Sequence, residues 1–248
     1  MLSREMKTFF RHAGLVIVLL LPLCAAAGDK FNVQRHNMVS GIREMVYDTR
    51  DLTGKAELAA GIMTAMGKVP RHEFVPADLH MLAYRNSPLP IGNDQTISQP
   101  YIVALMTDLA GVNKDSIVLE VGTGSGYQAA VLAELVHHVY TIEIIEALGL
   151  HAQETLQRLG YQNVTVRIGD GYHGWPEHAP FDAILVTAAA EHIPAPLLEQ
   201  LKPGGRLVIP LGREFATQAL TLVEKDPDGG IVQRAILPVG FVPLTGEH

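Results

Sequence analysis

The nine residues from Val118 to Gly126 combine a glycine turn with an acidic side chain, in the order V-L-E-V-G-T-G-S-G. Glycine removes the Cβ atom where a strand turns into a helix, so a ligand can lie against the backbone near the helix N-terminus. The spacing is G-x-G-x-G, one residue short of the dinucleotide fingerprint, and Glu120 stands in the preceding strand. A carboxylate there would repel a pyrophosphate and attract a cation. The turn therefore favours a nucleoside that carries a cationic sulfonium and an amino acid tail.

Two further acidic residues stand where a nucleoside needs hydrogen-bond acceptors. Glu143 lies 21 residues after Gly122, at the end of the next predicted strand, where a carboxylate can accept from both ribose hydroxyls. Asp170, followed by Gly171, ends the third strand, where a carboxylate can accept from an adenine amino group. Taken alone, Glu143 could be a solvated strand end and Asp170 a plain Asp-Gly turn. Ligands of open α/β sheets bind at the carboxyl ends of neighbouring strands, so the conjunction with Glu120 predicts one nucleoside site.

The elements that must position these residues alternate between strand and helix. Apolar runs of strand length and apolar-faced segments of helix length follow one another from Ser116 onward. The predicted strands are 116–121, 138–143, 164–168, 181–187 and 205–211, and the predicted helices are 127–136, 144–159 and 194–201. This order predicts an α/β fold with a doubly wound, mostly parallel, Rossmann-like sheet. A turn is expected at 202–205, and a C-terminal hairpin is expected from residues 219–224 and 231–238.

The residues before this core predict N-terminal helical additions and an extended loop, to which the family resemblance given below assigns contacts with substrate and cofactor. Apolar residues recur at helical spacing within 37–66, which predicts two amphipathic helices. Four prolines between residues 70 and 90 predict an extended, turn-rich stretch that ends at Ile91-Gly92. A further helix is expected from Pro100, with Ser98 as its N-cap.

The expected organisation is a signal-like segment followed by a single domain. The signal-like segment is 1–27 and the domain is 28–248, divided into 28–115 for the N-terminal helices and loop and 116–248 for the sheet and hairpin. The 248 residues are 48% hydrophobic and 18% charged, which suits one compact α/β core better than two full domains.

The net charge and the spacing of possible metal ligands limit the kinds of partner that the chain is expected to bind. Net charge is −7, and because residues 1–27 carry a net +2, the remainder carries −9. Nucleic-acid binders need a basic face, so no nucleic-acid partner is expected. The eleven histidines lack metal-ligand spacing such as H-E-x-x-H, and the only cysteine, Cys24, lies in the N-terminal segment. No metal site is therefore expected.

Five segments of the chain match one known family in order and spacing. They are the loop 91–100 (I-G-N-D-Q-T-I-S-Q-P), the turn 120–126, Asp170-Gly171, the strand 181–190 (F-D-A-I-L-V-T-A-A-A) and the turn 201–205 (L-K-P-G-G). In these segments the chain resembles the protein-L-isoaspartate (D-aspartate) O-methyltransferases, over about residues 37 to 245. The segment 95–100 is the specific part, because the two glycine turns occur across many methyltransferases. The resemblance implies the fold of class I S-adenosylmethionine-dependent methyltransferases.

The resemblance also implies an activity and a set of site residues. The activity is methyl transfer from S-adenosylmethionine to the α-carboxyl group of L-isoaspartyl residues in damaged proteins or peptides, which starts their repair through a succinimide. Ser98 takes the family's active serine position, where its hydroxyl would orient the substrate carboxylate. The expected cofactor-binding residues are Gln95, Thr96, Ile97, Glu120, Gly122, Thr123, Gly124, Ser125, Gly126, Glu143, Asp170 and Gly171. The expected substrate-binding residues are Thr96, Ser98, Thr187, Ala188, Val242 and Thr245.

One residue departs from the family pattern. Asp94 stands where the family commonly has a small residue, often glycine. Pointing inward, Asp94 would repel a carboxylate substrate; we expect it to point outward into solvent.

Three other functions are open to a chain with this turn. A methyltransferase for small molecules or RNA is opposed by the segment 95–100 and by the negative net charge. A nicotinamide-dependent oxidoreductase is opposed by Glu120 and by the short glycine spacing. A non-catalytic binding module is opposed by the presence of all the expected cofactor residues.

The first 27 residues bear on where the protein works. Three basic residues precede an apolar run from Ala13 to Leu23, and Ala25-Ala26-Ala27 offers the small residues that a signal peptidase needs. The run is short for a membrane span, so no stable membrane association of the mature domain is expected. A start codon assigned too early, with Met38 opening the body, is the alternative. Because S-adenosylmethionine is a cytosolic metabolite, we expect the cytoplasm, with the periplasm as the close alternative.

Overall fold

The structure is a computed structural model that describes residues 30–213 and 217–246. The signal-like segment 1–27 lies outside the described residues. The contacts of the chain from Phe31 onward are grouped in one unit.

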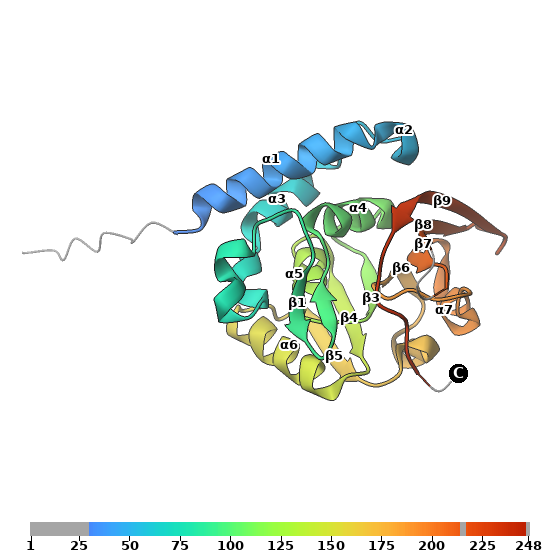
Figure 1. Ribbon diagram of the computed structural model, residues 1–248. Helices are drawn as coiled ribbons and strands as arrows, with labels where there is room; N and C mark the ends of the chain where they lie inside the picture. Colours follow the sequence, from blue (N-terminus) through green and yellow to red (C-terminus); the bar gives the residue numbers. More distant parts are fainter. Residues whose placement is uncertain (1–29, 214–216, 247–248) are drawn as a thin grey trace, which may run out of the picture. The chain divides into compact units, whose positions relative to one another are not determined.

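A seven-stranded sheet forms the centre of this unit (Figure 1). Its strands are β3 (Ile117–Val121), β4 (His138–Glu143), β5 (Val164–Ile168), β6 (Phe181–Val186), β7 (Leu201–Leu211), β8 (Gln218–Lys225) and β9 (Ile231–Val239). They lie in the order β5-β4-β3-β6-β7-β8-β9. The first five strands are parallel to one another, β8 is antiparallel to β7, and β9 is antiparallel to β8. The chain moves outward in opposite directions from the β3–β6 boundary, which makes this boundary the switch point where such sheets bind ligands. The predicted mostly parallel sheet and C-terminal hairpin are confirmed.

Helices cover both faces of the sheet, because alternate residues of each buried strand point to opposite sides. One apolar cluster joins Val118 of β3 to α4 (Pro100–Ala110), α5 (Tyr127–Ala133) and α6 (Glu146–Arg158). A second cluster joins Leu119 and Val121 of the same strand to α7 (Ala195–Glu199). The sheet is therefore doubly wound, as the sequence predicts.

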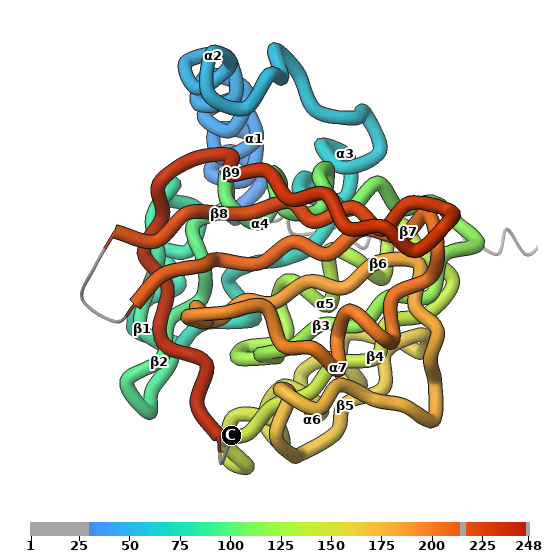
Figure 2. Tube along the Cα trace, turned by 90° about the vertical axis from the view of Figure 1, so that its right-hand side faces the viewer, coloured from blue at the N-terminus to red at the C-terminus, as the bar shows by residue number. Residues whose placement is uncertain are grey.

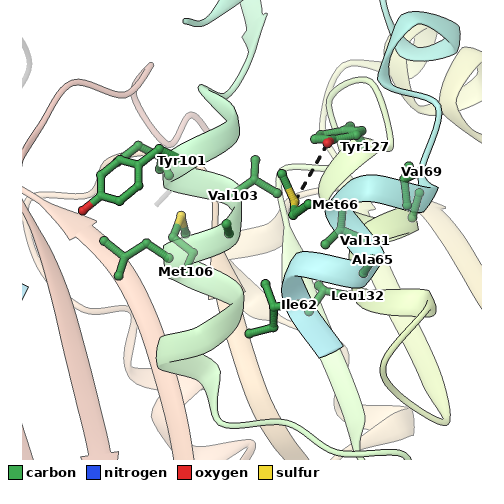
Figure 3. Packing of buried hydrophobic residues seen from close by; sticks show 14 of the residues in the cluster. Ile62, Ala65, Met66, Val69, Tyr101, Val103, Met106, Tyr127, Val131 and Leu132 are labelled. Carbon is green, nitrogen blue, oxygen red and sulfur yellow. Dashed lines mark hydrogen bonds between the residues drawn. The ribbon is translucent and has the colours of Figure 1, made fainter. Parts of the chain in front are cut away.

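The N-terminal additions pack on the first of these clusters. They are α1 (Asn32–Asp48), the single turn α2 (Arg50–Thr53) and α3 (Ala60–Lys68), so the two predicted helices are confirmed, although α1 begins five residues earlier than expected. α1 buries Met38, Ile42 and Val46, which share one helix face at four-residue spacing. Figure 3 shows α3 against α4 and α5, where the Tyr127 hydroxyl donates to Met66 Sδ at 3.9 Å. The packing of α3 therefore holds α4 and α5 in place at their N-terminal ends.

The proline-rich stretch is less extended than predicted. It contains two 3-10 helices, η1 (Arg71–Phe74) and η2 (Ala77–Leu82), before the hairpin of β1 (Leu89–Gly92) and β2 (Gln95–Ile97). Two residues with positive φ, Asn93 at 52° and Asp94 at 57°, form the hairpin turn, as two-residue turns of this twist require. Asp94 is exposed and does not line the pocket described below, so the expected outward position is confirmed.

The turn expected at residues 202–205 is part of a strand instead. β7 begins at Leu201, which pairs with Phe181, and the register then shifts until Arg206 pairs with Ala183. The ladder to β6 therefore continues on both sides of the Pro-Gly-Gly residues, which form an irregularity inside β7. Figure 2 shows β7, β8 and β9 as successive neighbours, with the chain running on from β9 to the C-terminus.

Candidate active site

A pocket lies at the carboxyl ends of β3, β4 and β6, bounded by β2 and by the C-terminal segment 242–245. Its space is about 780 Å³, including the part open to solvent. Of the residues expected to bind cofactor or substrate, all line it except Gly126 and Asp170. The sequence therefore predicted residues from six separate segments that the fold brings to one place.

Nine residues of the pocket wall were not predicted: Val103, Val121, Tyr127, Gln128, Ile142, Ile144, Ile145, Pro243 and Leu244. Most adjoin a predicted residue in sequence, so adjacency is the signal that could have found them. Val103 and Gln128 lie inside helices whose pattern only indicates a buried face. Nothing in the sequence distinguishes such helix positions from ordinary core.

Thr187 holds the glycine turn from the neighbouring strand. Its backbone N–H donates to Val121 O at 2.9 Å, and its hydroxyl donates to Gly122 O at 2.6 Å. Gly122 has φ 94°, and a Cβ atom there would lie 2.4 Å from Thr187 Oγ1. The positive φ and the close approach of Thr187 together favour glycine at position 122.

Gly126 lies behind the turn rather than in the pocket wall. It precedes α5 with φ 86°, and a Cβ atom there would lie 3.2 Å from Leu156 of α6. Its lack of a side chain lets α5 and α6 pack closely, which sets the position of the turn that lines the pocket.

Glu120 is a fully buried carboxyl group in the pocket wall. The Thr141 hydroxyl donates to Glu120 Oε2, and since Thr141 has one proton, the Thr123 hydroxyl 2.7 Å away must donate to Thr141. Glu120 Oε1 has no hydrogen-bond partner among the described residues. Burial raises the pKa of Glu120 strongly, the hydrogen bond from Thr141 lowers it, and the nearby Glu143 charge raises it, so that the pKa is about 8. The attraction for a cation expected from the sequence therefore depends on ionising Glu120.

Glu143 is held in place by two backbone groups. The Gly124 N–H donates to its Oε2 at 2.7 Å and the Ile145 N–H donates to its Oε1 at 3.0 Å. A carboxylate has about four acceptor sites, so each oxygen can accept one further hydrogen bond from the pocket side. This arrangement suits a ligand that presents two neighbouring hydroxyls.

Gln128, which also lines the pocket, carries a second unpartnered oxygen among the described residues. The Thr107 hydroxyl donates its only proton to Val103 O at 2.8 Å, so it can only accept from Gln128 Nε2 at 2.9 Å. This fixes the amide orientation and leaves Gln128 Oε1 buried without a partner in the described part of the chain. Such buried acceptors are costly unless a ligand donates to them.

Asp170 stands beside the pocket rather than in its wall. Its Oδ1 accepts from the Tyr172 N–H at 2.9 Å, which caps the short helix η3 (Gly171–His173). Gly171 lines the pocket. The C-terminal segment is held nearby, since the Ala189 N–H donates to Val242 O at 2.8 Å and the Leu244 N–H to Ala189 O at 2.7 Å.

Ser98 is half-buried and is not the N-cap of α4, so that prediction is wrong. Gln99 is the residue before the helix, with φ −51° and ψ 134°, and no side chain caps it. The reason is Pro100 at the first helical position, because a residue before proline is pushed to extended backbone. Within the described residues, nothing hydrogen-bonds the Ser98 hydroxyl, which leaves it for a ligand.

Arg71 holds the backbone on the far side of Ser98. Its guanidinium is fully buried; Nη2 donates to Ser98 O at 2.8 Å, and Nε donates to Ala83 O at 2.8 Å. It lies 4.7 Å from the ring centre of Tyr127, the first residue of α5. Burial lowers the pKa of Arg71 to about 10, so the group is still charged at neutral pH. One cation thus joins the Ser98 loop to the helix that follows the glycine turn.

We expect Arg71→Met to lower the free energy of unfolding by about 3 kcal/mol or more, because it leaves buried carbonyl groups without a donor. Arg71→Lys should lose less, since it keeps a buried cation. Thermal unfolding of both variants is the measurement. Arg85→Met, which changes an exposed arginine in the same stretch, is the matched control and should unfold like the parent. An unchanged melting temperature for Arg71→Met would show that Arg71 does not anchor the loop.

Neither a metal cluster nor a membrane-spanning helix occurs among the described residues. Within 30–213 and 217–246, no group of three or more histidine, cysteine, aspartate or glutamate residues could hold a metal ion. Across the same ranges, no helix has both the length and the apolarity to cross a membrane.

Known proteins resemble this chain in sequence and in fold. Residues 52–248 match the family described as Protein-L-isoaspartate(D-aspartate) O-methyltransferase (PCMT). Protein-L-isoaspartate O-methyltransferase 2 of Polaromonas sp. strain JS666 is 67% identical over 211 residues, which cover 85% of this chain and 100% of the relative.

Two solved structures share the fold. One is a protein-L-isoaspartate O-methyltransferase with a TM-score of 0.74 at 29% identity. The likeness covers 86% of this chain and 66% of the chain in that structure. The other is described as a putative protein-L-isoaspartate O-methyltransferase from Plasmodium falciparum in complex with S-adenosyl-L-homocysteine. Its TM-score is 0.66 at 24% identity, and the likeness covers 83% of this chain and 97% of the chain in that structure. At that identity the second likeness concerns the fold alone.

Proposed function

The chain belongs to the protein-L-isoaspartate (D-aspartate) O-methyltransferase family, and we propose that the pocket beside Ser98 is where it carries out the family's reaction. The protein is an S-adenosylmethionine-dependent methyltransferase that acts on isoaspartyl residues of proteins and thereby starts their repair. The observation that carries the proposal is that the segment 95–98 and the acidic residues Glu120 and Glu143 face one pocket.

The polar groups of the pocket fit the cofactor. Its amino acid end carries an ammonium group, and Glu120 Oε1 and Gln128 Oε1 are buried acceptors without a partner among the described residues. Its ribose carries two hydroxyls, and both oxygens of Glu143 can accept a further hydrogen bond. Asp170 and Gly171 are proposed to stand at the adenine end. When bound, S-adenosylmethionine supplies an electrophilic methyl group.

The protein residues are proposed to act on the substrate by position. A carboxylate is already ionised at neutral pH and needs no general base, so the task is to align it with the methyl group. The free Ser98 hydroxyl donates a hydrogen bond that orients the α-carboxylate of the isoaspartyl residue. Thr96, Thr187, Ala188, Val242 and Thr245 form the surrounding wall.

Methyl transfer from labelled cofactor to an isoaspartyl peptide, beside its normal aspartyl twin, tests the proposal directly. We expect label in the isoaspartyl peptide and little in the twin. Equal labelling of the two peptides, or none, would remove the substrate assignment. Calorimetry with S-adenosylhomocysteine and with NADH tests the cofactor independently of the substrate; tight binding of NADH would favour the oxidoreductase alternative.

We propose that the protein works in the cytoplasm, where its cofactor is made, and that residues 28–248 form a single methyltransferase domain. Fractionation of cells with mass spectrometry of the protein's N-terminus is the test. We expect the protein in the cytoplasmic fraction. A mature protein that starts at Gly28 and is found outside the inner membrane would establish the periplasmic alternative. The net charge of −9 on residues 28–248 supports the absence of a nucleic-acid partner.

A further inference from the structure

A second pocket adjoins the first at Ser98, and we propose that it selects peptides in which a large apolar side chain neighbours the isoaspartyl residue. This inference rests on the proposed function, because it names the class of peptide that the same site accepts. Four residues line both pockets: Thr96, Ser98, Thr187 and Val242. A peptide whose carboxylate reaches Ser98 can therefore place a neighbouring residue in the second pocket.

The walls of the second pocket come from segments far apart in the sequence. α1 contributes Met45, Thr49 follows α1 directly, the end of β9 contributes residues 237–239, and Phe241 follows. The space is about 1080 Å³, including the part open to solvent, which admits a large side chain. The N-terminal addition and the C-terminal strand thus build this pocket together.

The walls carry no charge. Among the described residues that line the pocket there is no aspartate, glutamate, lysine, arginine or histidine. A charged side chain entering it would lose hydration without gaining an ionic partner, whereas an apolar side chain would gain from leaving water. The pocket therefore favours an apolar side chain over a charged one.

Three polar side chains that line this pocket, Thr49, Gln99 and Tyr101, already have partners. The Thr49 hydroxyl donates its proton to Met45 O at 2.8 Å, so at the 2.6 Å contact with Tyr101 the Tyr101 hydroxyl must be the donor. Gln99 Nε2 donates to Asn86 O at 3.1 Å. Because these donors are engaged within the protein, an apolar guest strands none of them, and the free Ser98 hydroxyl stays available to the isoaspartyl carboxylate.

The test uses isoaspartyl peptides that differ only in one residue next to the isoaspartyl group, on its N-terminal or C-terminal side. That residue is leucine, lysine or glutamate. On one of the two sides we expect the leucine peptide to have a kcat/KM about tenfold higher than either charged peptide, with the difference in KM rather than kcat. The side on which the effect occurs identifies the residue that enters the pocket.

A charge placed on the wall makes the test specific. Pro238 is exposed on β9, and Pro238→Glu should raise the kcat/KM of the lysine peptide severalfold relative to the glutamate peptide. Val232→Glu adds the same charge at an exposed position of β9 outside the pocket and should leave the peptide preference unchanged.

The outcomes distinguish failure of the apolar pocket from failure of the proposed function. Equal kcat/KM for all isoaspartyl peptides, unaltered by Pro238→Glu, would overturn the apolar pocket while the proposed function stands. A preference for a charged neighbour in the parent protein would do the same. Absence of transfer to every isoaspartyl peptide, with S-adenosylhomocysteine still bound, would overturn both.

Discussion

Ser98→Ala is expected to lower kcat for methyl transfer to an isoaspartyl peptide by about tenfold or more, while the folded protein keeps its affinity for S-adenosylhomocysteine. A charge-assisted hydrogen bond is worth about 1.5 to 3 kcal/mol, and each 1.4 kcal/mol corresponds to a factor of ten in rate. The Ser98 hydroxyl has no hydrogen-bond partner among the described residues and lines both pockets, so its removal takes a donor from the substrate side alone.

The structure makes this prediction sharper than the sequence could. As an N-cap, Ser98 would contribute about 1 kcal/mol of stability, but it does not cap α4. Its contact with Arg71 uses the backbone carbonyl, which alanine keeps. We therefore expect an unchanged melting temperature for Ser98→Ala and an intermediate kcat for Ser98→Thr. Normal turnover by Ser98→Ala would remove the proposed substrate role and leave the cofactor assignment intact.

Glu120→Gln is expected to weaken S-adenosylhomocysteine binding by about tenfold or more at pH 8.5, because a hydrogen bond to a charged group is worth about 1.5 to 3 kcal/mol. Below a pKa of about 8 the ligand-free protein must release a proton from Glu120 before the carboxylate can pair with the ammonium group. The affinity of the parent protein should therefore rise between pH 6 and 8, and that of Glu120→Gln should not. Calorimetry in buffers of different ionisation enthalpy measures the released proton.

The same substitution should stabilise the ligand-free protein. The folded pKa of Glu120 is raised above its unfolded value, so its contribution to stability is fully present below pH 4.5 and is lost as pH rises towards about 8. Glutamine is uncharged and escapes this loss, which is on the order of a few kcal/mol. Melting temperatures should diverge between pH 5 and pH 8.5, with Glu120→Gln higher at pH 8.5. Equal melting temperatures, together with equal affinities, would mean that Glu120 is not the buried acceptor of the site.

Local patterns in the sequence determined the sheet and much of the pocket wall. The alternation of apolar strands and helices fixes where strands end, and parallel strands bring their carboxyl ends to one edge. Glu120, Glu143 and the residue pair Asp170-Gly171 could therefore be assigned to neighbouring ends from spacing alone. A local rule also predicts the residue that precedes α4. Because a residue before proline is extended, Gln99 lies outside the helix and takes the cap position, and Ser98 is excluded from it.

Only the tertiary structure decided the electrostatics of the pocket and the surroundings of Ser98. The pKa of Glu120 depends on complete burial, and the free oxygen of Gln128 depends on Thr107 in another helix. Arg71 hydrogen-bonds Ser98, which is 27 residues away in sequence. α1 and β9 line the second pocket together although they stand near opposite ends of the described sequence. Such contacts form between side chains that no local periodicity links, because the solvent exclusion and hydrogen bonding that define them arise when separate elements pack together.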